Sequence, residues 1–346
     1  MSDKKIVVLT QGYSNPVTAK TGTSVIRYRT DEVVALLDNE NTGKTSDDLL
    51  GVGGEIPVIG SLDDASDADT LLIGTAPTGG RLPEAWRDIV KAALSRGMNV
   101  VSGLHDLLGD DPELAAIADE SGGNIHDVRR NDECEVAVGT PLGNDTIRIL
   151  TVGNDCSVGK MVASIELDRA LQAKGHSSAF VATGQTGIMI TGEGIPIDRV
   201  IADFVNGAAE KLVKSKFDHD FVIVEGQGSI SHPLYSAVTL GLLHGSQPQG
   251  LILCYEAGRT TVSDKGIIPL KTMSELKTAY EVIGNLGSPT EFIAIVMNGR
   301  RLTAEEAEAE KARIRDEFGL PVCDVFRDGC DELVTAALAL RERVRS

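Results

Sequence analysis

Short runs of apolar, β-branched residues alternate along the whole chain with longer stretches whose apolar residues recur at helical spacing. This alternation predicts parallel sheets with helices on both faces, so the expected fold class is α/β. In the first part the pattern predicts strands near 6–9, 33–37, 70–73 and 99–101, with helices near 83–96 and 112–121. In the second part it predicts strands near 146–152, 178–182, 221–224, 250–254, 292–297 and 322–325, with helices near 160–174, 198–214, 273–286, 303–318 and 331–345.

The elements fall into two doubly wound units. A chain of 346 residues is long enough for about two domains, each with its own core. The polar, glycine-containing stretch from Asn131 to Asp145 has weak periodicity and precedes a new strand, which favours a boundary there. We therefore expect an N-terminal domain at 1–140 and a C-terminal domain at 141–346.

Charge and composition narrow the class of partner. The chain has 33 basic and 51 acidic residues, a formal net charge of −18, and only 4% aromatic residues. Such a chain would repel nucleic acids and anionic membranes, so we expect a small-molecule ligand and neither of those partners. The five cysteines show no disulfide framework and no zinc spacing, and the N-terminus reaches a strand without a signal peptide. These features predict a cytoplasmic protein with reduced thiols, and we also expect a homo-oligomer.

The strongest chemical signal lies between a strand predicted to end at Val152 and a helix that Lys160 opens. Backbone N–H groups of such a loop, the helix N-terminus and the lysine together bind phosphate oxygens. The spacing Gly153-x5-Gly159-Lys160 is one residue longer than the common motif and resembles the loop of dethiobiotin-synthetase-like P-loop proteins. We therefore predict a cofactor-binding loop made of Gly153, Asn154, Asp155, Cys156, Ser157, Val158, Gly159 and Lys160.

The residue after the lysine indicates whether the loop can bind Mg²⁺. P-loop enzymes usually present a hydroxyl to Mg²⁺ there, but this chain has Met161, and the next hydroxyl, Ser164, lies nearly a turn further on. A thioether does not replace that ligand for a hard cation. The loop thus favours a diphosphate bound without metal, and we expect no metal site. Asn298, at another predicted strand end, is a candidate contact to the base of a bound nucleotide.

A carboxylate and a histidine follow a later strand. Glu225 stands at the tip of an apolar strand, and Gly226 behind it allows the chain to turn close to a ligand. Without a metal to hold, Glu225 becomes the candidate general base, and His232 on the same loop could share that role. A helix-capping glutamate and a structural histidine are the alternatives. Cys156 could be a nucleophile, although a bound phosphate would cover it.

Further polar side chains stand where they could bind an acidic substrate. Two lie in a glycine-rich loop after a strand, one arginine follows another strand, and two isolated cations lie in the N-terminal half, where they could line a cleft between the domains. For the arginine, an ordinary surface salt bridge is the alternative. These candidates are Gln185, Thr186, Arg259, Lys20 and Arg27.

Three segments carry a resemblance that extends over nearly the whole chain: GNDCSVGKM at 153–161, ATGQTGIMITGEGIPIDRVIADFVNGA at 182–208 and VEGQGSISHPLYSAVTLGLLHGS at 224–246. With the Rossmann-like N-terminal half, they are similar to a bacterial and archaeal family long catalogued as a domain of unknown function. Members of that family have been assigned as D-glutamate N-acetyltransferases of the DgcN type, which use acetyl-CoA. The resemblance implies a Rossmann-like N-terminal domain and a P-loop NTPase-like, doubly wound C-terminal domain.

The resemblance also implies a reaction: acetyl transfer from acetyl-CoA to the amino group of D-glutamate or a similar acidic amino acid. This is chemically coherent, because coenzyme A carries a 3′-phospho-ADP whose phosphates suit a metal-free loop, and acyl transfer uses no ATP. Two alternatives stay open. One is an ATP-dependent ligase or kinase of the dethiobiotin-synthetase class with ATP and Mg as cofactor, and the other is a non-catalytic nucleotide-binding regulator.

Overall fold

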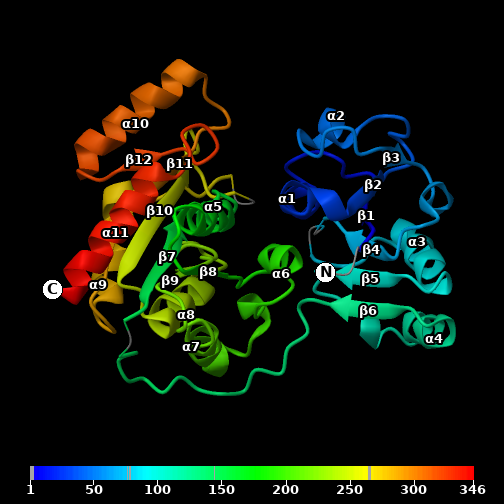
Figure 1. The fold of residues 1–346 in the computed structure, drawn as a ribbon, viewed down its shortest axis with the longest axis horizontal. Helices are drawn as coiled ribbons and strands as arrows, with labels where there is room; N and C mark the ends of the chain where they lie inside the picture. Colours follow the sequence, from blue (N-terminus) through cyan, green and yellow to red (C-terminus); the bar gives the residue numbers. More distant parts are fainter. Residues whose placement is uncertain (1–3, 76, 78, 144, 264–265) are drawn as a thin grey trace. The chain divides into compact units, whose positions relative to one another are not determined.

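The computed structural model describes residues 4–75, 77, 79–143, 145–263 and 266–346. Its chain divides into two compact units (Figure 1). Unit 1 contains Met1–Asn131 and Ile188–Pro196, and unit 2 contains Asp132–Gly187 and Ile197–Ser346. Each unit holds a parallel sheet of six strands, which confirms the predicted α/β class with two wound sheets. None of the helices in the described residues is both long enough and apolar enough to cross a membrane.

The boundary between the two units lies at the start of the polar stretch 131–145, where the sequence predicts a domain boundary. Unit 1 ends its first segment at Asn131, whereas the return of Ile188–Pro196 to unit 1 has no signal in the hydrophobic pattern. Within unit 1, Nη1 of Arg29 donates to the carbonyl oxygen of Met189 at 2.7 Å. The chain therefore leaves unit 2 at Gly187, joins unit 1 for Ile188–Pro196 and returns to unit 2 at Ile197, a path that only the folded structure shows.

The sheet of unit 1 has the strand order β3-β2-β1-β4-β5-β6, with every pair parallel. This is the strand order of a Rossmann fold. Its strands are β1 (Ile6–Leu9), β2 (Val33–Leu37), β3 (Val58–Ile59), β4 (Thr70–Ile73), β5 (Asn99–Ser102) and β6 (Asn124–Asp127). Its helices are α1 (Lys20–Tyr28), α2 (Ser46–Leu50), α3 (Glu84–Ser95) and α4 (Pro112–Ser121).

Alternate residues of the strands in unit 1 face different helices. Val7 and Leu9 of β1 share a core with α3 and α4, including Trp86 of α3. Val8 points the other way, where a side chain at Gly22 of α1 would come within 3.0 Å of it. Because both faces of the sheet are covered, β1 and β4 are buried throughout their length.

Unit 2 has the strand order β12-β11-β10-β7-β9-β8, again with every pair parallel. Its strands are β7 (Ile147–Gly153), β8 (Ser178–Val181), β9 (Phe221–Val224), β10 (Gly250–Glu256), β11 (Glu291–Asn298) and β12 (Val322–Cys323). Its helices are α5 (Lys160–Ala173), α7 (Val205–Lys214), α8 (Ser236–Ser246), α9 (Met273–Gly284), α10 (Ala304–Phe318) and α11 (Asp331–Arg345). A further helix, α6 (Gln185–Thr191), spans the point where the chain passes between the units.

The order of the strands in unit 2 places a ligand site at the end of β7. The chain first adds strands on one side of β7, as β8 and β9, and then on the other side, as β10, β11 and β12. The crevice at such a reversal, outside the carboxyl ends of the strands, is where open α/β sheets bind ligands. The loop at 153–159 follows β7 directly, so it occupies this position.

The core of unit 2 explains why its central strands are apolar without interruption. Ile147 and Ile149 of β7 share one core with α5 and α11, while α8 contacts β7 and packs against α7. Every residue of β7, β9 and β10 is buried. Strands covered on both faces lose the alternation of apolar and polar residues, which is why they read as continuous apolar runs.

Most predicted elements agree with the structure to within a few residues. The sequence pattern misses the short strands β3 and β6 and the helices α1, α2, α6 and α8, and it places the start of one helix too early. The helix expected at 198–214 is interrupted: short 3₁₀ segments at Ile197–Arg199 and Ala202–Phe204 precede α7. Helix α8 was not predicted because it carries glycines within an apolar sequence. A side chain at Gly241 or Gly245 would lie 2.1 Å from Val205 or 2.3 Å from the carbonyl oxygen of Asn206. These glycines therefore permit the close packing of α8 on α7.

Gly226, directly after Glu225, passes against the backbone of β7. A Cβ at Gly226 would lie 1.6 Å from the carbonyl oxygen of Thr151. The amide of Gly226 donates to the Thr151 hydroxyl at 3.0 Å, so the two segments are fixed to each other. Only a residue without a side chain fits this contact.

We expect Gly226→Ala to lower the free energy of unfolding by ~1–3 kcal/mol or more, because the new methyl group must displace backbone rather than a side chain. The matched control is Gly287→Ala, since the nearest atoms to a Cβ there lie at ordinary contact distances of 3.7 and 3.9 Å. Urea unfolding monitored by circular dichroism measures both. Equal midpoints for the two variants would contradict the contact.

Candidate functional site

The loop between β7 and α5 has a backbone shape that L-residues rarely adopt. Gly159, the residue before the helix, has φ +107°, and Ser157 has φ +55°. Positive φ at a non-glycine residue costs about 1–3 kcal/mol and is concentrated at functional sites. The loop is therefore held in its shape by surrounding contacts.

Helix α5 begins at Lys160 and points its positive end at the loop. Its first turn contains no acidic residue, and the buried Nζ of Lys160 donates to the carbonyl oxygen of Asp155 at 2.7 Å. Unneutralised N–H groups of a helix start and a nearby ammonium favour an anion. Met161 follows the lysine, while the hydroxyl of Ser164 bonds with Thr151 and donates to the carbonyl oxygen of Lys160, both at 3.0 Å.

A buried carboxylate fastens the loop to the segment after β10. Oδ2 of the fully buried Asp155 accepts from Nη1 of Arg259 at 2.8 Å and from the amide of Ser263 at 2.7 Å. Oδ1 accepts from the amide of Cys156 at 2.7 Å. The Asp155 carboxylate is thus engaged by groups of the protein, so this residue contributes to a ligand site through its backbone.

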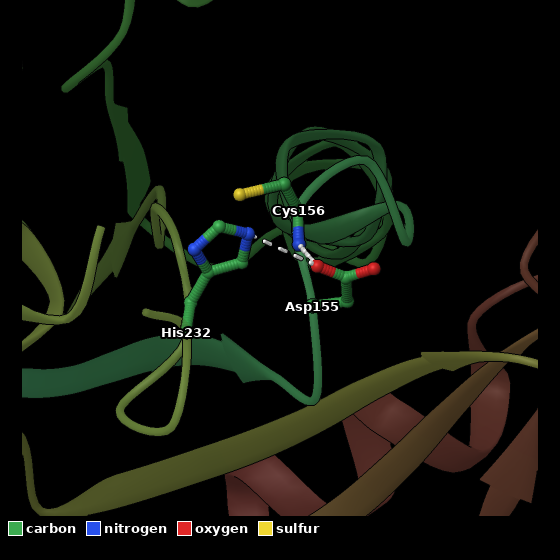
Figure 2. Close-up of side chains that lie close together, drawn as sticks. All are labelled: Asp155, Cys156 and His232. Carbon is green, nitrogen blue, oxygen red and sulfur yellow. Dashed lines mark hydrogen bonds and ion pairs between the residues drawn. The ribbon is translucent and has the colours of Figure 1, made fainter. Parts of the chain in front are cut away.

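Figure 2 shows Asp155, Cys156 and His232 together, where the loop after β9 meets the loop between β7 and α5. Their possible ligand atoms lie within 4.8 Å of one another, a grouping that could hold a metal ion. The amide of Leu234, however, donates to Nδ1 of His232 at 3.1 Å. An amide only donates, so Nδ1 accepts and the proton of the neutral ring is on Nε2.

The position of this ring proton determines what His232 can do. Nε2 faces Oδ1 of Asp155 at 3.5 Å, so a metal ion would have to displace the proton and share the carboxylate with Arg259. The arrangement favours a role for His232 in packing against the loop over a role in a metal site. It also makes His232 a proton donor rather than an acceptor, which leaves Glu225 as the candidate base.

Glu225 lies at the end of β9, the strand beside β7. One of its oxygens, Oε2, accepts from the amides of Thr183 at 2.9 Å and Gly184 at 3.1 Å, both in the loop after β8. Burial raises the pKa of Glu225 to about 7, although these two hydrogen bonds and the charge of Lys160 lower it. A carboxyl group with this pKa gains and loses a proton near neutral pH, as a general base must.

On the other side of the loop, three arginines surround one carboxylate. Glu256, buried at the end of β10, pairs with Arg259, with Arg300 through Nε and Nη2, both at 3.1 Å, and with Nε of Arg301 at 2.8 Å. We call Arg259, Arg300, Arg301 and Glu256 the arginine cluster. Sequence reasoning missed Arg300 and Arg301, although two adjacent cations just after a strand end were a usable signal.

The structure brings several predicted site residues to one edge of the sheet in unit 2. The loop residues, Glu225, His232 and Arg259 meet there, with Arg259 holding Asp155 and Glu256. Gln185 is buried at the start of α6, next to Thr186. Asn298 ends β11 and accepts from the amide of Arg300 at 3.2 Å.

The remaining predicted cations belong to the other unit. Lys20 and Arg27 lie exposed on α1 of unit 1, so the edge formed by unit 2 is built without them. Their contact with substrate stays a prediction, as does that of Gln185, Thr186 and Asn298.

Comparison with known proteins places the chain in a family. The P-loop domain of DUF1611, described as a domain of unknown function, matches residues 135–334, and the Rossmann-like N-terminal domain of that family matches residues 39–131. A crystal structure of a DUF1611 family protein from Anabaena variabilis is similar with a TM-score of 0.92 and 34% identity, covering 97% of this chain and 99% of that one.

Two relatives carry names that describe an activity. A protein named D-glutamate N-acetyltransferase from Tritonibacter scottomollicae is 40% identical over 277 residues, covering 80% of this chain and 83% of the relative. A protein of the same name from Pseudoalteromonas sp is 39% identical over 272 residues, covering 77% and 80%. These names support an acetyltransferase. The resemblance stated from the sequence is confirmed, and the chain belongs to the DUF1611 family, with its Rossmann-like and P-loop domains.

Proposed function

We propose that this protein is an N-acetyltransferase that transfers the acetyl group of acetyl-CoA to the amino group of D-glutamate or a similar acidic amino acid. The acceptor and the acetyl group come from the names of the two relatives. Acetyl-CoA as the donor is part of our proposal and rests on the chemistry of the loop. The observation in the structure that carries the proposal is Glu225, a buried carboxyl group with a pKa of about 7 beside a phosphate-type loop.

The loop residues fit the diphosphate of coenzyme A. The start of α5 offers N–H groups in a first turn that contains no acidic residue, and Lys160 adds a positive charge. The residue after the lysine is Met161, and the Ser164 hydroxyl is engaged with Thr151 and main-chain carbonyls, so a metal-free diphosphate suits this loop better than Mg·ATP. Oδ1 of Asn154 is buried and accepts no hydrogen bond from the described residues. Coenzyme A, whose arm carries amide N–H groups, has donors that could satisfy it.

Glu225 would act as the general base of the transfer. The attacking amine must lose a proton, and a carboxylate with a pKa of about 7 can accept it near neutral pH. As the nitrogen bonds to the acetyl carbon, the carbon–sulfur bond of the thioester breaks and the thiolate leaves. The amides of Thr183 and Gly184 fix one oxygen of Glu225 and so orient the group.

The direct test is release of free thiol from acetyl-CoA with ATP omitted, comparing D-glutamate, L-glutamate and D-aspartate as acceptors. We expect thiol release with D-glutamate and formation of N-acetylglutamate by mass spectrometry, because the acceptor amine cleaves the thioester. No thiol release with any acceptor would refute the proposal. Product formed only with Mg·ATP would instead favour a ligase.

Glu225→Gln keeps the shape of the side chain but removes its basic form. We expect kcat to fall by about 10²-fold or more with little change in the KM for acetyl-CoA. For the unmodified protein, kcat/KM should rise with pH through about 7, since Glu225 must be deprotonated to accept a proton. The variant should lose this limb of the profile.

The matched control for Glu225→Gln is Glu291→Gln, an exposed residue at the start of β11, the opposite end of that strand from the site. Its rate and pH profile should equal those of the unmodified protein. A Glu225→Gln variant that keeps its rate and its pH limb would remove Glu225 from the mechanism.

Binding at the loop can be followed through Cys156, which is partly exposed. We expect coenzyme A to protect Cys156 from N-ethylmaleimide in EDTA-containing buffer, because the bound diphosphate covers the loop. Lys160→Ala should raise the concentration needed for protection several-fold or more, since it removes a charge-assisted contact. Mass spectrometry of the labelled peptides measures both effects.

Two internal controls accompany this labelling experiment. Exposed Cys134 should react at the same rate with and without coenzyme A, whereas burial raises the pKa of Cys254 and Cys330 to about 12 and keeps them unreactive. Lys174→Ala, at the C-terminal end of α5, should leave protection unchanged. Protection that needs Mg²⁺, or that survives Lys160→Ala unaltered, would contradict a metal-free loop.

A further inference from the structure

We infer that the arginine cluster binds the 3′-phosphate of the coenzyme A ribose and thereby selects coenzyme A over nucleotides that lack this group. This inference rests on the proposed use of acetyl-CoA. It assigns a ligand to Arg300 and Arg301, which the transfer chemistry itself does not need.

The cluster holds more positive charge than its carboxylates neutralise. Three guanidinium groups meet the carboxylates of Glu256 and Asp155, which leaves an excess of one positive charge in a chain whose net charge is −18. Such a local excess attracts an anion to this edge despite the overall charge.

Arg300 and Arg301 also present that charge to solvent. Their side chains are 42% and 59% exposed, whereas Glu256 beneath them is buried. Arg301 reaches Glu256 through Nε at 2.8 Å, and its guanidinium carries two further nitrogens that can donate. A guanidinium offers five N–H donors in a planar fork, and that fork matches two oxygens of a phosphate.

The cluster lies on the same edge of the sheet as the loop. Cys254 of β10 is paired with Gly153 at the end of β7, and Glu256 at the end of β10 is paired with Asn298 at the end of β11. Neighbouring strands lie about 4.8 Å apart, so the ends of β7 and β11 are separated by about 10 Å, within reach of one nucleotide. Arg259 joins the two sites directly, because it binds both Asp155 of the loop and Glu256.

This geometry distinguishes coenzyme A from ATP and ADP. A nucleotide whose diphosphate lies on the loop and whose ribose extends over β10 and β11 brings its 3′ position to the cluster. Only coenzyme A has a dianionic phosphate there. Glu256 holds the arginines in place beforehand, so less side-chain freedom is lost on binding.

The test compares coenzyme A with dephospho-coenzyme A, which differs only in the 3′-phosphate, by isothermal titration calorimetry in EDTA-containing buffer. We expect the unmodified protein to bind coenzyme A about 10-fold or more tightly than the dephospho form, given the strength of charge-assisted pairs. The double variant Arg300→Ala/Arg301→Ala should lose this preference while binding dephospho-coenzyme A as before. Glu256 keeps Arg259 in this variant, and an unchanged melting temperature will verify its fold.

The control variant is Arg343→Ala. Its side chain is 52% exposed, between the values of Arg300 and Arg301, and it pairs with Glu291 at the far end of β11, so the variant should keep the full preference. Equal binding of the two ligands by the unmodified protein would overturn the inference and leave the proposed function standing. Equal weakening of both ligands in the double variant would also overturn it, since the cluster would then only support the loop. Binding of neither ligand would refute the proposed function, and the inference with it.

Discussion

The buried contact between Asp155 and Arg259 is the interaction on which the site in unit 2 depends. An ionised carboxylate is costly to bury unless it is paired and hydrogen-bonded, and here a guanidinium and two backbone amides supply that pairing. The contact connects the loop after β7 to the segment after β10, two segments more than 100 residues apart. Because these partners belong to the protein, the loop has its curved shape before any anion arrives.

A second buried carboxyl group has a different environment and therefore a different role. Both carboxyl groups are buried and accept hydrogen bonds from two amides, but Asp155 also forms a direct ion pair with Arg259, whereas burial is the largest influence on the pKa of Glu225. Burial raises the pKa of Glu225 to about 7, so this residue can exchange a proton where Asp155 supports structure. In the proposed reaction, two acids that lie just after adjacent strands thus take a structural and a chemical role, through the partners that surround them.

The strand order of unit 2 places Glu225 on one side of β7 and the arginine cluster on the other. On one side, the ends of β9 and β8 bring together Glu225 and the amides that hold it. On the other side, the ends of β10 and β11 carry Glu256 and the arginines. A ligand placed on the central loop meets a proton acceptor on one side and positive charge on the other. This division fits the proposed reaction, in which an acyl donor with three phosphates meets an amine that must be deprotonated.

Much of the fold and part of the site follow from the sequence alone. Buried strands and amphipathic helices have local signatures, so most elements, both wound sheets and the loop from Gly153 to Lys160 were predictable. Helix α8 was not, because Gly241 and Gly245 have the composition of a loop and their reason, close contact with α7, exists only after packing. In the site, too, the contacts that explain a residue's role form only after packing.

The motif identified Glu225, His232 and Arg259 as polar residues near strand ends, but their partners come from distant parts of the chain. Only the folded structure pairs Arg259 with Asp155, directs the amide of Leu234 to Nδ1 of His232, and gathers Arg300 and Arg301 over Glu256. The sequence by itself determined most of the elements and the position of the phosphate loop, because these depend on local spacing. Only the tertiary structure decided which charged side chains pair with each other and which are buried, because pairing and burial depend on residues brought together across the sheet.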